Sequence, residues 1–106
     1  MTSVDDRKGK ESIPERFALR LNHPNPFNAN TQIRYELPKT THVSIKIYSV
    51  AGQLVRTLIS GTIQAGYHAV EWDGRDETGV TLLSGVYLYE MVAGAFKEVR
   101  RMVLLK

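Results

Sequence analysis

Three histidines are the first residues of this sequence that could do chemistry. His23, His42 and His68 stand 19 and 26 residues apart, so none has a second histidine at the i, i+2 or i, i+4 spacing that chelates a metal from one element. His68 shares an alternating face with Val70 and Trp72, which favours a partly buried packing residue. We predict no histidine metal centre.

An acidic loop offers the second candidate chemistry. Asp73, Asp76 and Glu77 stand among glycines, and such a loop can hold Ca²⁺ through carboxylate and backbone oxygens. However, Arg75 occupies a position where a calcium loop needs another acid, and Asp and Gly are also the ordinary residues of tight turns. The sequence favours a turn, with calcium as the weaker alternative.

The residues of a covalent or cofactor-dependent enzyme are not arranged here in a recognisable pattern. There is no cysteine, and Ser84-Gly85 precedes a strand pattern rather than the helix that a hydrolase nucleophile needs. Glycine-rich turns do not open a helix that could bind phosphate. Tyrosines at strand spacing could stack on sugars or bases, but cross-strand pairing is the more usual reason for them. We therefore predict a non-catalytic protein with no cofactor and no nucleic-acid partner.

Charge is concentrated at the end of the sequence. The 106 residues carry a net charge of +3, and the last ten contain four basic residues and one acidic residue, which equals that excess. A basic strand of this kind is either an electrostatic contact surface or an edge strand protected against aggregation, and charge alone does not decide between them.

The sequence contains no apolar run long enough for a membrane span and no signal-peptide pattern. We therefore expect an export signal elsewhere on a longer parent protein or in the domain itself.

Hydrophobic residues alternate with polar ones along most of the chain. Phe17, Leu19 and Leu21 predict a first strand, Gly52 predicts a hairpin turn, and residues 60–66 predict a loop. Seven short strands separated by turn signals predict an all-β, seven-stranded immunoglobulin-like antiparallel sandwich with Trp72 in its core. We expect residues 1–16 to be a flexible linker or a remnant of cloning, and residues 17–106 to be the domain.

Several motifs, taken together, resemble the C-terminal sorting domains of type IX secretion (the Por system). They are Pro24-Asn25-Pro26-Phe27 in an opening loop, a central block with Trp72-Asp73-Gly74 and Gly85-Val86-Tyr87, and the ending Met102-Val103-Leu104-Leu105-Lys106. The central block is shared with the Ig-like domain of the flagellar hook-capping protein. The resemblance covers residues 17–106, and it assigns structural roles to Pro24, Asn25, Pro26, Phe27, Trp72, Asp73, Gly74, Gly85 and Tyr87.

The resemblance implies a function in export. Such a domain follows an N-terminal cargo domain in the same chain, passes through the periplasm of a Gram-negative bacterium, and is recognised by an outer-membrane translocon and a sortase-like peptidase. The cargo then reaches the cell surface or the medium. We expect recognition through the basic final strand, by strand addition at a sheet edge. The predicted partner-binding residues are Lys97, Arg100, Arg101, Met102, Val103, Leu104, Leu105 and Lys106.

Two other functions are compatible with the same residues. One is an Ig-like assembly or adhesion module. The other is a carbohydrate-binding accessory module of a larger secreted enzyme, which would use Tyr67, Tyr87 or Tyr89. A dimer through an exposed edge strand is a further possibility under any of these functions.

Overall fold

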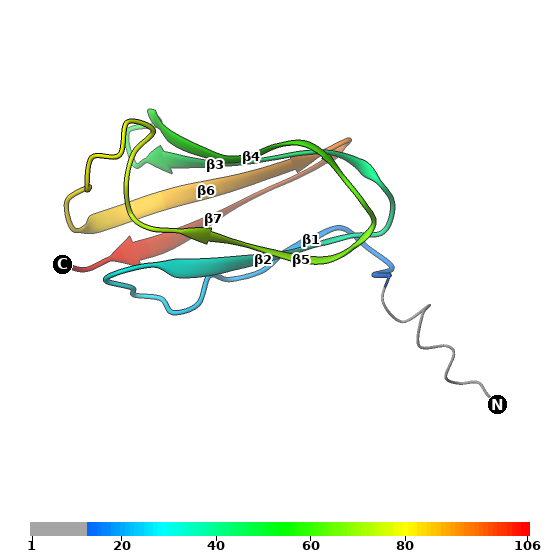
Figure 1. Ribbon diagram of the computed structural model, residues 1–106, viewed down its shortest axis with the longest axis horizontal. Coiled ribbons are helices and arrows are strands. Elements are labelled where there is room, and N and C mark those ends of the chain that lie inside the picture. The colour runs from blue at the N-terminus through cyan, green and yellow to red at the C-terminus, as the bar shows by residue number, and fades with distance from the viewer. Residues whose placement is uncertain (1–12) are drawn as a thin grey trace.

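Two antiparallel sheets form the domain in this computed structural model, which describes residues 13–106. One sheet has the strand order β1-β2-β5 and the other β4-β3-β6-β7, and Figure 1 shows them as two layers. The strands are β1 (Ala18–Leu19), β2 (Thr31–Leu37), β3 (Thr41–Ser49), β4 (Leu54–Ile63), β5 (Gly66–Trp72), β6 (Gly85–Ala93) and β7 (Phe96–Leu104). The predicted seven-stranded Ig-like sandwich is confirmed. No helix able to span a membrane occurs in the described part of the chain.

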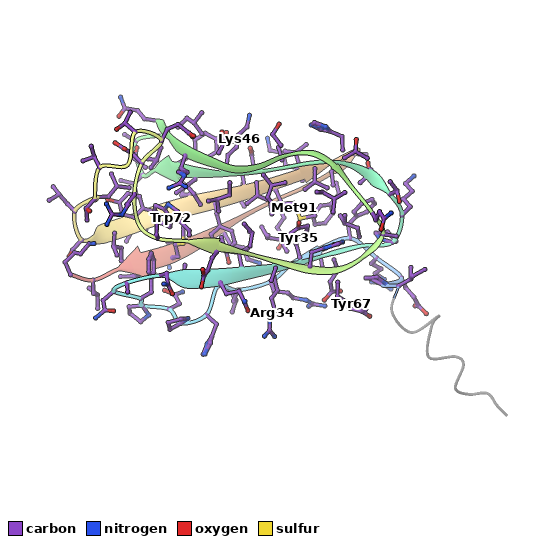
Figure 2. The ribbon with its side chains drawn as sticks, in the orientation of Figure 1. Arg34, Tyr35, Lys46, Tyr67, Trp72 and Met91 are labelled. Carbon is purple, nitrogen blue, oxygen red and sulfur yellow. The ribbon has the colours of Figure 1, made fainter. Side chains whose placement is uncertain are left out.

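Alternation of side chains builds the core between the layers. β2 is buried at Thr31, Ile33, Tyr35 and Leu37 and turns the residues between them outward. β3 and β6 contribute Ile45 and Met91, and Trp72 at the end of β5 is fully buried, as predicted. Figure 2 places Tyr35, Trp72 and Met91 between the two sheets.

The linker prediction for residues 1–16 falls mostly outside the described residues. Of the four that are described, Pro14 is buried and Ile13 is 49% exposed.

The sequence-based strand limits are wrong in two places. Residues 60–66 were expected to form a loop, but β4 continues to Ile63 because Ile59 and Ile63 pack against the core and Gly61 pairs with Val43. The first strand is only two residues long, and Leu21 is 63% exposed although it was predicted to share the inward face of Leu19.

A bulge explains the position of Leu21. Leu19 lies opposite Tyr35 and His23 opposite Gln32, so four residue steps on one side face three on the other. The Arg20 amide still donates to the Arg34 carbonyl at 2.9 Å, so one residue is inserted after Arg20. The insertion reverses the side-chain alternation and leaves backbone groups without a partner on β2. Asn22 is buried in place of Leu21.

The hydroxyl of Tyr89 in β6 supplies the missing hydrogen bonds across the sandwich. It accepts from the Asn22 amide at 3.0 Å and donates to the Arg20 carbonyl at 2.8 Å. Burial raises the pKa of Tyr89, so the hydroxyl keeps the proton that it donates. This contact ties the two sheets together at the entry to the Pro-Asn-Pro loop.

We predict that Tyr89→Phe destabilises the domain by about 1–3 kcal/mol, because it leaves the buried Asn22 amide and the partly buried Arg20 carbonyl without partners. Chemical unfolding monitored by circular dichroism measures the change. The control is Tyr67→Phe, on a ring that is 58% exposed, which we expect to change stability by less than about 0.5 kcal/mol. Equal stability of the two variants would contradict the role given to the Tyr89 hydroxyl.

Candidate functional site: the Pro-Asn-Pro loop and the last strand

The Pro-Asn-Pro loop lies along the outer edge of β7. Phe27 forms a parallel bridge with Leu104: its amide donates to the Val103 carbonyl at 3.0 Å, and its carbonyl accepts from the Leu105 amide at 2.8 Å. The Asn25 side chain accepts from the Val103 amide at 3.0 Å. Two motifs that stand 78 residues apart in the sequence therefore form one surface.

Internal contacts hold the loop in this position. The Thr31 hydroxyl donates to the Pro24 carbonyl at 2.8 Å, and the Asn22 amide group donates to the same hydroxyl at 3.0 Å. Both the His23-Pro24 and Asn25-Pro26 peptide bonds are cis. The Phe27 ring is 2% exposed and lies 5.6 Å from the Trp72 ring, so it anchors the loop in the core.

The central block of the motif supports the same end of the sandwich. The Trp72 indole donates to the Arg75 carbonyl at 2.9 Å, and the Tyr87 ring meets the indole edge-on at 5.7 Å. Gly74 has a φ of +75°, which favours glycine, and its α-carbon faces the Leu104 side chain. Gly85 begins β6 opposite Leu104.

The final strand divides its predicted contact residues between the core and the surface. Met102 and Leu104 are fully buried, so they cannot meet a partner while the domain is folded. Lys97, Arg101, Leu105 and Lys106 are exposed, and Val103 is half-buried. Fewer residues are therefore available for recognition than the sequence predicted.

Arg100 has a structural contact rather than a free charge. Its guanidinium donates to the Leu19 carbonyl at 2.6 Å and pairs with Glu98 at 2.9 Å, which ties β7 to β1. Lys97 pairs with Glu90 at 3.4 Å while remaining exposed. Arg101 and Lys106 are the final-strand cations for which the described residues provide no ion pair.

Strand addition at β7 is restricted by the loop. In an antiparallel ladder, alternate residues direct their backbone groups to the same side. The groups of Val103 and Leu105 on the outer side are used by Asn25 and Phe27, which leaves those of Lys97, Val99 and Arg101. That remaining stretch carries charged side chains, which disfavour pairing with another strand.

The acidic loop uses its carboxylates in protein hydrogen bonds. Asp76 accepts from Thr78 and Val80, and the Thr78 hydroxyl is the main reason that its pKa lies below the ordinary value. Asp73 accepts from the Arg56 guanidinium at 3.2 Å, and Glu77 accepts from the Thr57 amide at 2.9 Å. Each carboxylate faces a different set of donors, and no group of three metal-ligating side chains occurs in residues 13–106.

Two of the three histidines border one hollow on the outer face of the β1-β2-β5 sheet, and His42 lies in β3 of the other sheet. His68 stacks on Tyr35 at 5.3 Å with its Nε2 2.7 Å from the Gln64 carbonyl oxygen, while His23 is exposed. Of the three tyrosines considered for sugar binding, Tyr89 is fully buried and Tyr87 packs on Trp72, so Tyr67 alone presents its ring. Tyr67 borders a shallow hollow of about 650 Å³ on the outer face of the β1-β2-β5 sheet. Figure 2 shows it pointing away from that sheet, beside Arg34.

Sequence reasoning missed some of the residues that build this site. Asn25 was identified only as part of a motif, not as the acceptor for the last strand. Ser84, dismissed as a nucleophile, accepts from the Lys106 amide at 2.8 Å and so fixes the strand end. Neither long-range contact leaves a periodic signal in the sequence.

Comparison with known proteins gives one family match. The model of the FlgD Ig-like domain matches residues 26–95, which include Pro26 and Phe27 of the loop, the central block and β6, but not Pro24, Asn25 or β7. No curated protein matches the sequence.

Three solved structures have a similar fold. Dimeric latent PorU from Porphyromonas gingivalis has a TM-score of 0.68 and 20% identity over 87% of this chain and 9% of its own. PorZ, an essential bacterial surface component of the type IX secretion system of the same organism, has a TM-score of 0.58 and 19% identity over 84% of this chain and 12% of its own. FlgD from P. aeruginosa has a TM-score of 0.55 and 24% identity over 70% of this chain and 57% of its own.

At these identities, the likeness concerns the fold. The chain spans about a tenth of the length of PorU and PorZ.

We predict that Asn25→Ala speeds hydrogen exchange at the Val103 amide, because the substitution removes the acceptor that closes this part of the β7 edge. The stability cost is about 1 kcal/mol, the usual value of one hydrogen bond. Amide exchange followed by NMR measures the effect. The matched control is Asn28→Ala, an exposed residue of the same loop. Unchanged exchange at Val103 in Asn25→Ala would refute the contact.

Proposed function

We propose a function from the premise that this chain belongs to the family of the FlgD Ig-like domain. It is a non-catalytic C-terminal sorting domain that directs an attached cargo protein through the type IX outer-membrane translocon. The domain folds in the periplasm, and its cargo ends on the cell surface or in the medium of a Gram-negative bacterium.

One observation supports this proposal above the others. The two motifs that most resemble sorting domains, the Pro-Asn-Pro loop and the last strand, meet in a single surface. The small hollow at their junction is lined by Pro24, Pro26, Phe27, Asn28, Leu105 and Lys106. A receptor that contacts the exposed strand end therefore meets the loop as well. The shared fold with PorZ, a component of this secretion system, is consistent with the proposal.

Recognition by side chains fits this surface better than strand addition at its end. The loop already bonds the β7 edge at Val103 and Leu105, whereas the side chains of Leu105 and Lys106 remain exposed. Lys97 and Arg101 add positive charge that steers an acidic partner toward the strand. The sortase-like peptidase acts on the chain that joins cargo to domain, so it needs no catalytic group from the sandwich.

The alternative functions now depend on different surfaces. A carbohydrate-binding module would have to rely on Tyr67 and the hollow beside it. An assembly module or an edge dimer would use β4, whose residues 59–63 carry no charge, in contrast to the charged edge of β7. Neither surface includes the loop and strand junction.

We predict that residues 1–106, fused to the C-terminus of a periplasmic reporter, carry it out of a bacterium that has type IX secretion. The double variant Leu105→Ser with Lys106→Glu keeps the fold, because both side chains are exposed, but it lowers extracellular reporter about tenfold. The measurement is the ratio of extracellular to periplasmic reporter. Deleting residues 97–106 is a poorer test, because it also removes the buried Met102 and Leu104.

The control makes the same chemical changes elsewhere, as Leu21→Ser with Lys39→Glu, both at exposed positions. We expect it to be exported like the unmodified fusion. If the unmodified fusion stays in the periplasm, the proposed function is wrong. If the strand-end variant and the control are exported alike, the junction is not the recognised surface.

A further inference from the structure

The outer face of the β4-β3-β6-β7 sheet carries an unusual number of apolar side chains. β6 turns Tyr87, Tyr89 and Met91 toward the core, so its alternate residues Val86, Leu88 and Val92 point outward. In β7, Val99 and Val103 point the same way, opposite the buried Met102 and Leu104. Val86 pairs directly with Val103, and the exposed fractions of Val86 and Val99 are 37% and 48%. These five residues, Val86, Leu88, Val92, Val99 and Val103, form what we call the valine face.

The opposite sheet provides an internal comparison. The outward residues of β2 are Gln32, Arg34 and Glu36, which are all polar, and those of β5 are Tyr67, Ala69 and Glu71. An antiparallel sheet that faces water on one side ordinarily has a mainly polar outer face. The valine face departs from that pattern. Its Val86 and Val99 are exposed and its other three residues are half-buried, and a contiguous apolar patch of this kind marks interaction sites.

Positive charge surrounds the valine face. Lys97 and Arg101 lie on β7 and Lys46 on the adjoining β3, and Glu90 on β6 is the acidic residue among them. Glu90 is already engaged by Lys97 at 3.4 Å and by the Tyr48 hydroxyl at 3.4 Å. Three cations and one acid give the face a charge of +2, and the ion pairs of residues 13–106 include neither Lys46 nor Arg101. Figure 2 shows Lys46 pointing outward from this sheet, away from Arg34 and Tyr67 on the other.

We propose that the valine face is a docking surface for a protein that presents an apolar patch flanked by carboxylates. The inference rests on the proposed function and names the face through which the exported domain meets its receptor. Apolar and charged side chains alternate across the strands, since Leu88 lies opposite Arg101 and Glu90 opposite Val99. Such a mixed flat surface matches another protein surface, whose apolar core and polar rim can be complementary to it. A membrane of anionic lipids would instead repel the Glu90 carboxylate, which lies within the face opposite Val99.

The valine face also adjoins the site described above. Val103 contributes its side chain to this face, while its backbone is bonded to Asn25 and Phe27. One receptor can therefore contact the sheet face and the loop junction together. In this proposal, Val99, Arg101 and Val103 of the basic final strand contact the receptor. The buried Met102 and Leu104 pack in the core.

The test uses paired substitutions in the reporter fusion. Val86→Thr with Val99→Thr keeps the β-branched shape on a solvent-facing position, so the thermal midpoint of the purified domain stays unchanged. We expect the ratio of extracellular to periplasmic reporter to fall about tenfold, equivalent to losing 1.4 kcal/mol of binding. Lys46→Glu with Arg101→Glu is expected to reduce export at least as much, since it places like charges against the carboxylates of the partner.

Controls separate the possible outcomes. Leu21→Thr with Arg34→Glu makes comparable changes on the outer face of the other sheet and should leave export unchanged. Export of both valine-face variants at the level of the unmodified fusion would overturn the docking surface and leave the proposed function intact. A fusion that is not exported even without substitutions would overturn both. Flotation of the purified domain with phosphatidylglycerol vesicles, lost in the Val86→Thr and Val99→Thr variant, would overturn the protein partner in favour of a membrane.

Discussion

The unpaired edge of the last strand is the constraint on which this structure depends. A sandwich has outer strands whose amides and carbonyls must meet water or a substitute partner, and an unprotected edge invites pairing with other chains. Here the Pro-Asn-Pro loop supplies that partner for β7, with Asn25 as acceptor and Phe27 as both donor and acceptor. The contact brings a motif near the start of the domain against its final residues, so each closes hydrogen bonds of the other.

The other outer strand of the same sheet is closed in a similar way. At β4, the Glu77 amide donates to the Val55 carbonyl at 3.0 Å, and the Glu77 carboxylate accepts from the Thr57 amide at 2.9 Å. At both outer strands, a loop amide donates to a carbonyl of the strand, and a loop side-chain oxygen accepts from an amide of the strand. These hydrogen bonds lie at the Trp72 end of the sandwich, where the indole is packed against Phe27 and Tyr87. The loops that these sequence motifs form therefore bond the otherwise unpaired backbone groups of the outer strands. Aromatic side chains fix these loops to the core.

Short-range patterns in the sequence were sufficient for the number of strands and for Trp72 in the core, but not for the limits of β1 and β4. In β2 and β3 every second residue is mainly apolar, so the alternation identifies the buried face. Gly52 in the hairpin turn has the positive φ expected of it. The alternation does not identify the buried face where the residues on both faces of a strand are apolar. In β6, tyrosines alternate with valine and leucine, so the sequence does not show which set faces outward. It also fails at Leu21, because a bulge is stabilised by Tyr89 from the other sheet, a contact 69 residues away. The division of the last strand into buried Met102 and Leu104 and exposed neighbours likewise depends on its pairing with β6.

These features combine into an account of recognition by a folded surface. The final strand holds the core together through one set of side chains and presents the other set beside the Pro-Asn-Pro loop. Site-specific photocrosslinking during export tests this account most directly, with a photoreactive amino acid replacing Val99 in the reporter fusion, or Ala69 on the opposite outer face. We expect adducts with an export component from position 99 and none from position 69. Adducts from position 69 alone, or equally from both, would contradict this account.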